Sequence, residues 1–174
     1  SDFSIQNKRG SVYEMLSGSA SGLVYQDTQS GNVYFVANKN GNLSKPKVLF
    51  NMSAVSSLKL SQDGRYLAVS YYVVNAAAYK TSVRIFDMEK SSWIELGKNG
   101  YRDGSIVMND GSYYLLAVRT QGQCSFLSSF RIGEKSVEFV RELSVPRGDM
   151  IMSAVDAGQG KIATIYKNGL TWSI

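Results

Sequence analysis

A turn followed by a short aliphatic strand recurs four times along this chain of 174 residues. The copies carry glycines at positions 22, 64, 111 and 160, which are 42, 47 and 49 residues apart. Two copies contain Asp-Gly, at Asp63-Gly64 and Asp110-Gly111, and this pair favours a tight turn because glycine reaches a positive φ at no steric cost. The spacing indicates about four copies of one structural unit.

Each unit contains further segments with the pattern of β-strands. In Ser82–Asp87 apolar and polar residues alternate, as expected for a strand with one buried face. The expected strands are 12–16, 55–60, 105–108 and 152–156 before the turns, 32–37, 82–87, 125–132 and 170–174 as third strands, and 47–50, 93–96 and 137–143 as outer strands. This pattern predicts an all-β fold, a β-propeller of about four blades with four antiparallel strands each.

We expect residues 1–174 to form a single β-propeller domain, whose blades cover approximately 11–50, 55–96, 104–143 and 151–174. The last blade has no outer strand of its own, and residues 3–6 are a candidate to complete it. Three arrangements fit this pattern: a closed four-blade unit, part of a larger propeller of roughly six to eight blades, and a homodimer whose two copies complete one ring. The homodimer would avoid exposed sheet edges.

The sequence lacks the residues that most hydrolytic and metal-dependent sites need. It contains no histidine and one cysteine, Cys124. A Ser-His-Asp triad and histidine metal sites are therefore excluded, and Cys124 has no histidine to activate it. The nucleophile elbow Gly-x-Ser-x-Gly is also absent. We expect no enzyme activity, no cofactor and no metal ion.

Charge and hydropathy limit the classes of partner. The formal net charge is +5, but the basic residues are scattered and no basic run exceeds two. A nucleic-acid site would cluster them with aromatic residues, so we expect no nucleic-acid partner. The most apolar stretch, 66–79, is too short to span a bilayer. We expect contact with a membrane only through an anchor outside this sequence.

The segment Leu58–Val69 contains Ser-Gln-Asp-Gly-Arg followed by Tyr-Leu-Ala-Val. It resembles the propeller repeat of TolB-type proteins and of the N-terminal, WD40-like domains of prolyl-oligopeptidase and dipeptidyl-peptidase enzymes, in which a strand ends in Ser-Pro-Asp-Gly-Arg. Gln62 stands where that family usually has proline. Val83–Glu89 similarly resembles the family's third strand. The resemblance implies a propeller and an extracytoplasmic or cell-surface location in a bacterium, but no reaction.

In such a meander, the loops between second and third strands emerge on the same side as the connections between blades, and we call this side the loop face. Loops on a rigid scaffold usually carry the binding residues. The most unusual of these expected loops is 71–80. Its apolar and aromatic side chains would be costly if fully exposed, so we expect them to pack against the protein or to contact a partner. The candidate binding residues on this face are Asn75, Tyr79, Lys80, Tyr101, Arg102, Asp103, Arg147 and Asp149.

Together these features favour a non-enzymatic interaction or ligand-sensing module that presents loop residues to a protein, peptide or glycan. The alternative is an accessory propeller domain of a larger enzyme, such as a prolyl-oligopeptidase-type peptidase, where it would gate substrate access.

Overall fold

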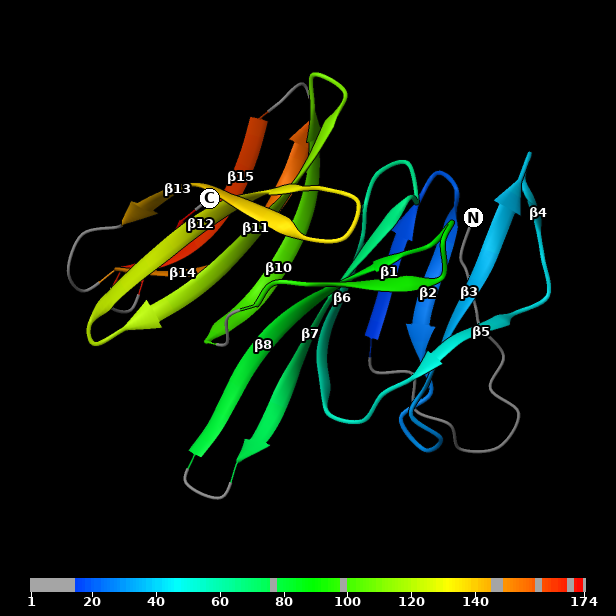
Figure 1. The fold of residues 1–174 in the computed structure, drawn as a ribbon, viewed down its shortest axis with the longest axis horizontal. Coiled ribbons are helices and arrows are strands. Elements are labelled where there is room, and N and C mark those ends of the chain that lie inside the picture. The colour runs from blue at the N-terminus through cyan, green and yellow to red at the C-terminus, as the bar shows by residue number, and fades with distance from the viewer. Residues whose placement is uncertain are drawn as a thin grey trace.

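The computed structural model describes residues 15–75, 78–97, 100–144, 149–158, 161–168 and 171–173. Within these residues the chain forms sixteen β-strands in four antiparallel sheets, and no helix. The sheets follow one another in chain order, and we call them blades 1 to 4 (Figure 1). The predicted all-β fold is confirmed.

Blade 1 has one strand more than the pattern predicted. The chain runs through β1 (Met15–Ser19), β2 (Gly22–Gln26) and β3 (Asn32–Lys39) as an antiparallel meander. Two short strands then pair with β3, namely β4 (Asn42–Leu43) at its end and β5 (Lys47–Asn51) along its length. The extra strand β4 arises because Asn40 and Gly41 both adopt a positive φ, which turns the chain back on itself directly after β3.

Blades 2 and 3 are four-stranded meanders in sequence order. The strands of blade 2 are β6 (Val55–Leu60), β7 (Tyr66–Asn75), β8 (Ala78–Asp87) and β9 (Ser92–Glu95). The strands of blade 3 are β10 (Tyr101–Asn109), β11 (Ser112–Gln121), β12 (Cys124–Ile132) and β13 (Val137–Ser144). Each of these strands contains or overlaps a strand expected from the repeat.

Blade 4 contains β14 (Asp149–Gly158), β15 (Lys161–Asn168) and β16 (Thr171–Ser173), paired in that order. The predicted completion of this blade by residues 3–6 lies outside the described residues.

Two segments predicted as loops are strands in the structure. Pairing between β7 and β8 continues from Tyr71 with Ser82 to Asn75 with Ala78, so the predicted loop 71–80 is a long hairpin. Its β-branched and aromatic residues suit a strand better than a loop, and the prediction of a loop was wrong for that reason. Likewise, β10 begins at Tyr101, which places residues 101–103 in a strand rather than in the connection between blades.

The hydrophobic core lies between the blades. One cluster joins blades 1 and 2, and includes Val24, Val33, Leu67, Val69 and Phe86. A second cluster joins blades 2 and 3, and includes Val83, Ile85, Ile106, Leu115 and Phe130. Because both faces of blade 2 are covered, its strands hold apolar side chains on both sides, and blade-on-blade burial is the main source of stability.

The turn between β6 and β7 is closed by its own side chains. Asp63 Oδ1 accepts hydrogen bonds from Ser61 Oγ at 2.7 Å and from the Arg65 amide at 3.1 Å. Gly64 has a φ of 78°, and a Cβ at this position would overlap Ser21 Oγ in blade 1. Glycine is therefore required here both by the backbone conformation and by the close approach of the neighbouring blade.

The same turn also fastens blade 2 to blade 3. The Tyr113 hydroxyl donates a hydrogen bond to Asp63 Oδ2 at 2.5 Å, and the Tyr113 ring packs edge-on against Tyr66 at 4.8 Å. The hydrogen bond to Asp63 is the main cause that raises the pKa of Tyr113 to about 12. For Asp63, burial acts to raise the pKa, but the hydrogen bonds from Tyr113, Ser61 and the Arg65 amide outweigh it and lower the pKa.

This contact predicts a late tyrosine ionisation. The folded state holds the Tyr113 proton more tightly than the unfolded chain, whose tyrosine pKa is near 10.0. The stability that the bond contributes is therefore complete below pH 10.0 and is lost as the pH rises towards about 12. An ultraviolet titration should show one tyrosine ionising near pH 12 that is missing from Tyr113→Phe. Identical titration curves for the two proteins would contradict this prediction.

Candidate functional site

The loop face carries the turns between second and third strands and the connections between blades. In Figure 1 the β2–β3 turn, the connection from β5 to β6 and the end of the β7–β8 hairpin lie on the lower side of the view. The β1–β2 and β6–β7 turns lie on the opposite side, which we call the hairpin face. Antiparallel pairing within each blade produces this division, because successive turns alternate between the two ends of the strands.

The described candidate residues on the loop face differ in their surroundings. Lys80 is exposed on β8. Tyr101 is only 5% exposed, and its ring packs edge-to-face against Phe130 with centroids 5.5 Å apart. The structure therefore places Tyr101 in the core between blades 2 and 3. Its ring contacts other protein side chains and not the surface where a ligand was expected.

Arg102 and Asp103 lie at the start of β10. Burial lowers the pKa of Arg102, and the nearby Asp103 carboxylate opposes this effect. Asp103 is 9% exposed, and its Oδ2 lies 2.6 Å from Lys59 Nζ on β6. Asp103 therefore belongs to an ion pair between the first strands of blades 2 and 3.

The remaining candidates are placed by their backbone alone or lie outside the described residues. Asn75 ends β7, Tyr79 lies in β8 and Asp149 begins β14. Arg147 lies outside the described residues. The role of these four residues in binding stays a prediction.

Blade 1 holds a polar hollow on the loop face that the sequence analysis missed. This loop cavity has a volume of about 350 Å³. It is lined by Gln26, Thr28, Gln29, Ser30, Gly31, Asn51, Ser53, Ala54 and Val55. The lining comes from the β2–β3 turn and the β5–β6 connection, which are the two kinds of loop that define this face. None of the lining side chains is charged, and amides and hydroxyls predominate.

Gln26 is a buried polar residue in the lining of the loop cavity. Its side chain is 4% exposed, and its Nε2 donates a hydrogen bond to the Met52 carbonyl at 2.7 Å. Within the described residues, the Gln26 Oε1 accepts no hydrogen bond. An amide oxygen in the lining of a hollow can accept a hydrogen bond from a ligand or from water.

The rim of the loop cavity is held in shape by local hydrogen bonds. Asp27 accepts hydrogen bonds from the Gln29 amide at 3.0 Å and from Ser30 Oγ at 2.8 Å. The bond from Ser30 is the main cause that lowers the pKa of Asp27, and burial acts in the other direction. Asn51 Nδ2 adds a bond to the Ser30 carbonyl at 2.7 Å. These bonds fix the turn and so preorganise the cavity.

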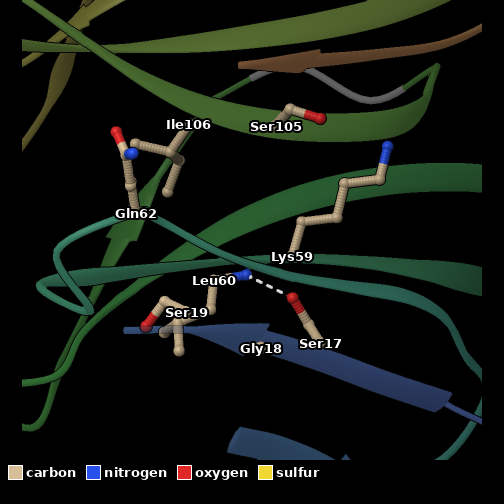
Figure 2. A pocket seen from close by; sticks show the side chains of 8 residues that line it. All are labelled: Ser17, Gly18, Ser19, Lys59, Leu60, Gln62, Ser105 and Ile106. Carbon is tan, nitrogen blue, oxygen red and sulfur yellow. Dashed lines mark hydrogen bonds between the residues drawn. The ribbon is translucent and has the colours of Figure 1, made fainter. Parts of the chain in front are cut away.

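A second polar hollow lies near the hairpin face, between the first strands of blades 1, 2 and 3 (Figure 2). We call it the inner-strand cavity, and its volume is about 280 Å³. It is lined by Ser17, Gly18, Ser19, Lys59, Leu60, Gln62, Ser105 and Ile106. Ser17 Oγ accepts a hydrogen bond from the Leu60 amide at 2.8 Å, which joins β1 to β6 across the blade interface.

Two signals in the sequence could have pointed to these hollows. The polar run Gln26–Asn32 stands between two strands, and its position marks it as a loop of the same kind as those chosen in the other blades. The inner-strand cavity left a weaker signal, because Ser17 and Lys59 are single polar residues on strands that the sequence separates by more than forty positions.

Two kinds of feature are absent from the described residues. In that part of the chain no group of three or more cysteine, aspartate or glutamate side chains gathers so that it could hold a metal ion. No helix there is long and apolar enough to cross a membrane. The absence of a metal, a cofactor and an enzyme activity stays a prediction.

Solved structures with a similar fold are β-propellers. The β-propeller domain of the trilobed protease from Pyrococcus furiosus matches with a TM-score of 0.57 at 14% identity, over 90% of this chain and 53% of that one. The WD40 repeats of RRP9 match with a TM-score of 0.54 at 11% identity, over 92% of this chain and 46% of that one. Prolyl oligopeptidase B from Galerina marginata matches with a TM-score of 0.57 at 15% identity, over 91% of this chain and 24% of that one.

These likenesses show the fold alone, because the identities are low. No protein-family model matches the sequence, and no curated protein matches it. The chain spans about half the length, or less, of the three solved chains that it matches.

Proposed function

We propose that this chain, which has a β-propeller fold with its core between successive sheets, is a non-enzymatic binding module whose loop face receives a protein, peptide or glycan partner. The observation that carries this proposal is the loop cavity, an uncharged hollow of about 350 Å³ lined by amides and hydroxyls on a preorganised turn.

The chemistry of the loop cavity suits partners with many neutral donors and acceptors. Main-chain amides of a peptide and hydroxyls of a glycan both pair with side chains such as Gln26 and Asn51. A charged ligand would find no opposite charge among the lining residues. The exposed ring of Tyr72, on the long β7–β8 hairpin, offers a second contact for a large partner on the same face.

Substitution of Gln26 tests this proposal. Peptide and glycan arrays would first identify a ligand of the purified chain, and titration calorimetry would then give its affinity. Gln26→Leu should weaken binding about tenfold, because it replaces a buried donor and acceptor with an apolar group. Thr28→Ala, at the exposed rim of the same cavity, should weaken binding by a smaller factor without disturbing the fold.

The matched control is Gln62→Leu, an exposed glutamine in the turn between β6 and β7, on the hairpin face. It should leave the affinity unchanged. If Gln26→Leu and Thr28→Ala both bind as tightly as the unchanged protein while retaining its thermal unfolding curve, the loop cavity is not the binding site.

A second candidate function is an accessory propeller of a larger enzyme, such as a prolyl-oligopeptidase-type peptidase. Two of the similar structures favour it, since one is the propeller domain of a protease and another is a prolyl oligopeptidase. In that case the native gene must encode several hundred further residues that include a nucleophile elbow. A native gene without such a domain would eliminate this candidate.

We also propose the bacterial extracytoplasmic location and the homodimer, neither of which follows from the fold. Secretion of the natural protein and its mass in solution would test them independently of the ligand.

A further inference from the structure

The first strand of blade 2 pairs with only part of the second. β6 pairs with β7 as far as Val55, which lies opposite Tyr71. One further hydrogen bond joins the Tyr72 amide to the Ala54 carbonyl at 2.8 Å. β7 itself continues in its pairing with β8 to Asn75. The last residues of β7 therefore have β8 on one side and no described strand on the other, and we call this side, from Tyr72 to Asn75, the uncovered edge.

The backbone at Ala54 explains why the pairing stops there. Ala54 has a φ of 59°, in the left-handed region that residues with a Cβ rarely adopt. Two residues earlier, the Met52 amide donates a hydrogen bond to the Gly31 carbonyl of blade 1 at 3.0 Å. The chain thus changes direction at Ala54 as it passes from blade 1 into β6. It leaves β7 without a neighbour where β6 would otherwise have begun earlier.

The uncovered edge presents main-chain donors and acceptors. In an antiparallel sheet both polar groups of a residue point towards the same neighbouring strand, and successive residues alternate in direction. Because the Tyr72 amide points towards β6, the Tyr72 carbonyl and both main-chain groups of Val74 point to the uncovered edge. Within the described part of the chain, no strand pairs with these groups. Figure 1 shows this end of the β7–β8 hairpin projecting on the loop face.

The uncovered edge adjoins the loop cavity. Ser53, Ala54 and Val55 line that cavity, and Ala54 accepts the last hydrogen bond from β7. A strand added in line with β6 would run along the uncovered edge and reach the loop cavity with one end. The neutral amides and hydroxyls of the cavity can pair with the main-chain groups of such a strand.

The side chains near the uncovered edge narrow the class of partner. The Tyr72 side chain is 47% exposed, and an aromatic residue on a sheet packs against the side chain directly opposite on the next strand. Lys80 is exposed, lies opposite Val73 in the register, and is the only charged residue between positions 71 and 80. These features favour a partner strand that places an apolar residue beside Tyr72 and carries no excess of positive charge.

We propose that an extended peptide binds to the uncovered edge as an added strand, antiparallel to β7, with one end in the loop cavity. A peptide carries main-chain donors and acceptors at the same spacing as β7, so it can bond to Tyr72 and Val74 in the manner of β-strand addition. This binding mode rests on the proposed function, because it takes the loop face as the binding face. It selects a peptide among the partners proposed there.

The experiment uses the full chain and, as the probe, a phage-displayed library of short linear peptides. Titration calorimetry with a selected synthetic peptide would give its affinity. N-methylation at successive peptide residues should weaken binding about tenfold or more at every second residue and little at the residues between, since only alternate amides face β7. Hydrogen exchange followed by NMR should show the Val74 amide exchanging about tenfold more slowly in the complex.

A pair of variants at one position tests the protein side of the contact. Val74→Pro removes the main-chain donor at the uncovered edge and should weaken the peptide about tenfold or more. Val74→Ala is the matched control, because it shortens the side chain and keeps the amide, and it should leave the affinity nearly unchanged. The N-methylation series needs no change in the protein, so it gives a result even if Val74→Pro disturbs the hairpin.

Strand addition is excluded if the library yields no binding peptide, if N-methylation shows no period of two residues, or if folded Val74→Pro binds as tightly as the unchanged protein. Gln26→Leu separates these outcomes from the proposed function. A peptide or glycan that is weakened by Gln26→Leu and unaffected by Val74→Pro would show binding in the loop cavity without strand addition. If Gln26→Leu, Thr28→Ala and Val74→Pro are all without effect, both proposals are wrong.

Discussion

Replacing Asp87 with alanine is expected to destabilise the protein by about 3 kcal/mol or more. The Asp87 side chain is 2% exposed, and it closes the turn between β8 and β9. Its Oδ1 accepts hydrogen bonds from the amides of Glu89 at 3.0 Å and Lys90 at 2.9 Å, and its Oδ2 lies 3.1 Å from Arg65 Nη2. Removing the carboxylate leaves two backbone donors and a guanidinium without their buried acceptor.

Urea unfolding would measure this loss, with two further variants to separate its causes. Asp87→Asn keeps an acceptor for the two amides and should cost less than alanine. Glu95→Ala removes the partner of Arg84 in an exposed ion pair of 3.0 Å, and should cost at most about 1 kcal/mol. If Asp87→Ala and Glu95→Ala had equal effects, burial of the Asp87 network would not be the source of its stability.

The second large effect is expected at Gly104, in β10, where blade 3 packs against blade 2. A Cβ on Gly104 would lie 2.6 Å from Val83 Cγ1 and 3.3 Å from Leu115 Cδ1. Val83 is 1% exposed and its branched side chain has little rotamer freedom, so it cannot move aside. Gly104→Ala should therefore destabilise the protein by about 1–3 kcal/mol through overpacking between the two blades.

A double-mutant cycle makes this prediction specific. Val83→Ala removes the methyl groups that the new Cβ would meet. The double variant should lose less stability than the sum of the two single variants, by about 1 kcal/mol. Additive effects would show that the cost at Gly104 arises in the backbone of β10 and not in contact with Val83. Gly104→Ala with unchanged stability would contradict the close approach of the blades.

The strands could be predicted from the sequence because their signals are local. Asp63-Gly64 and Asp110-Gly111 mark hairpin turns through the positive φ that glycine allows, and the structure has a positive φ at both glycines. The alternation in Ser82–Asp87 is a local signal too, because successive side chains of a strand point to opposite faces of the sheet, and the structure has a strand there. The extension of β7 and β8 was missed, although Val73 and Val74 favour a strand.

The candidate site was harder to predict. The idea of a loop face depends only on the direction of the strands, and the structure places a polar hollow on that face in blade 1. The direction of the strands did not predict which residues line this hollow. Tyr101 appeared suited to an interface by type, but it is buried against Phe130, and Asp103 is engaged by Lys59. Residue type alone does not reveal whether an aromatic or charged group contacts protein or solvent.

By itself, the sequence determined the repeat, the all-β class and the approximate position of nearly every described strand, because turns and alternation depend on residues only a few positions apart. Only the tertiary structure decided which polar residues share a hollow. Lys59 and Asp103 are 44 residues apart and meet at 2.6 Å because β6 and β10 pack against one another. That packing depends on the summed contacts of Val83, Gly104, Ile106 and their neighbours, and no short segment of the chain contains this information.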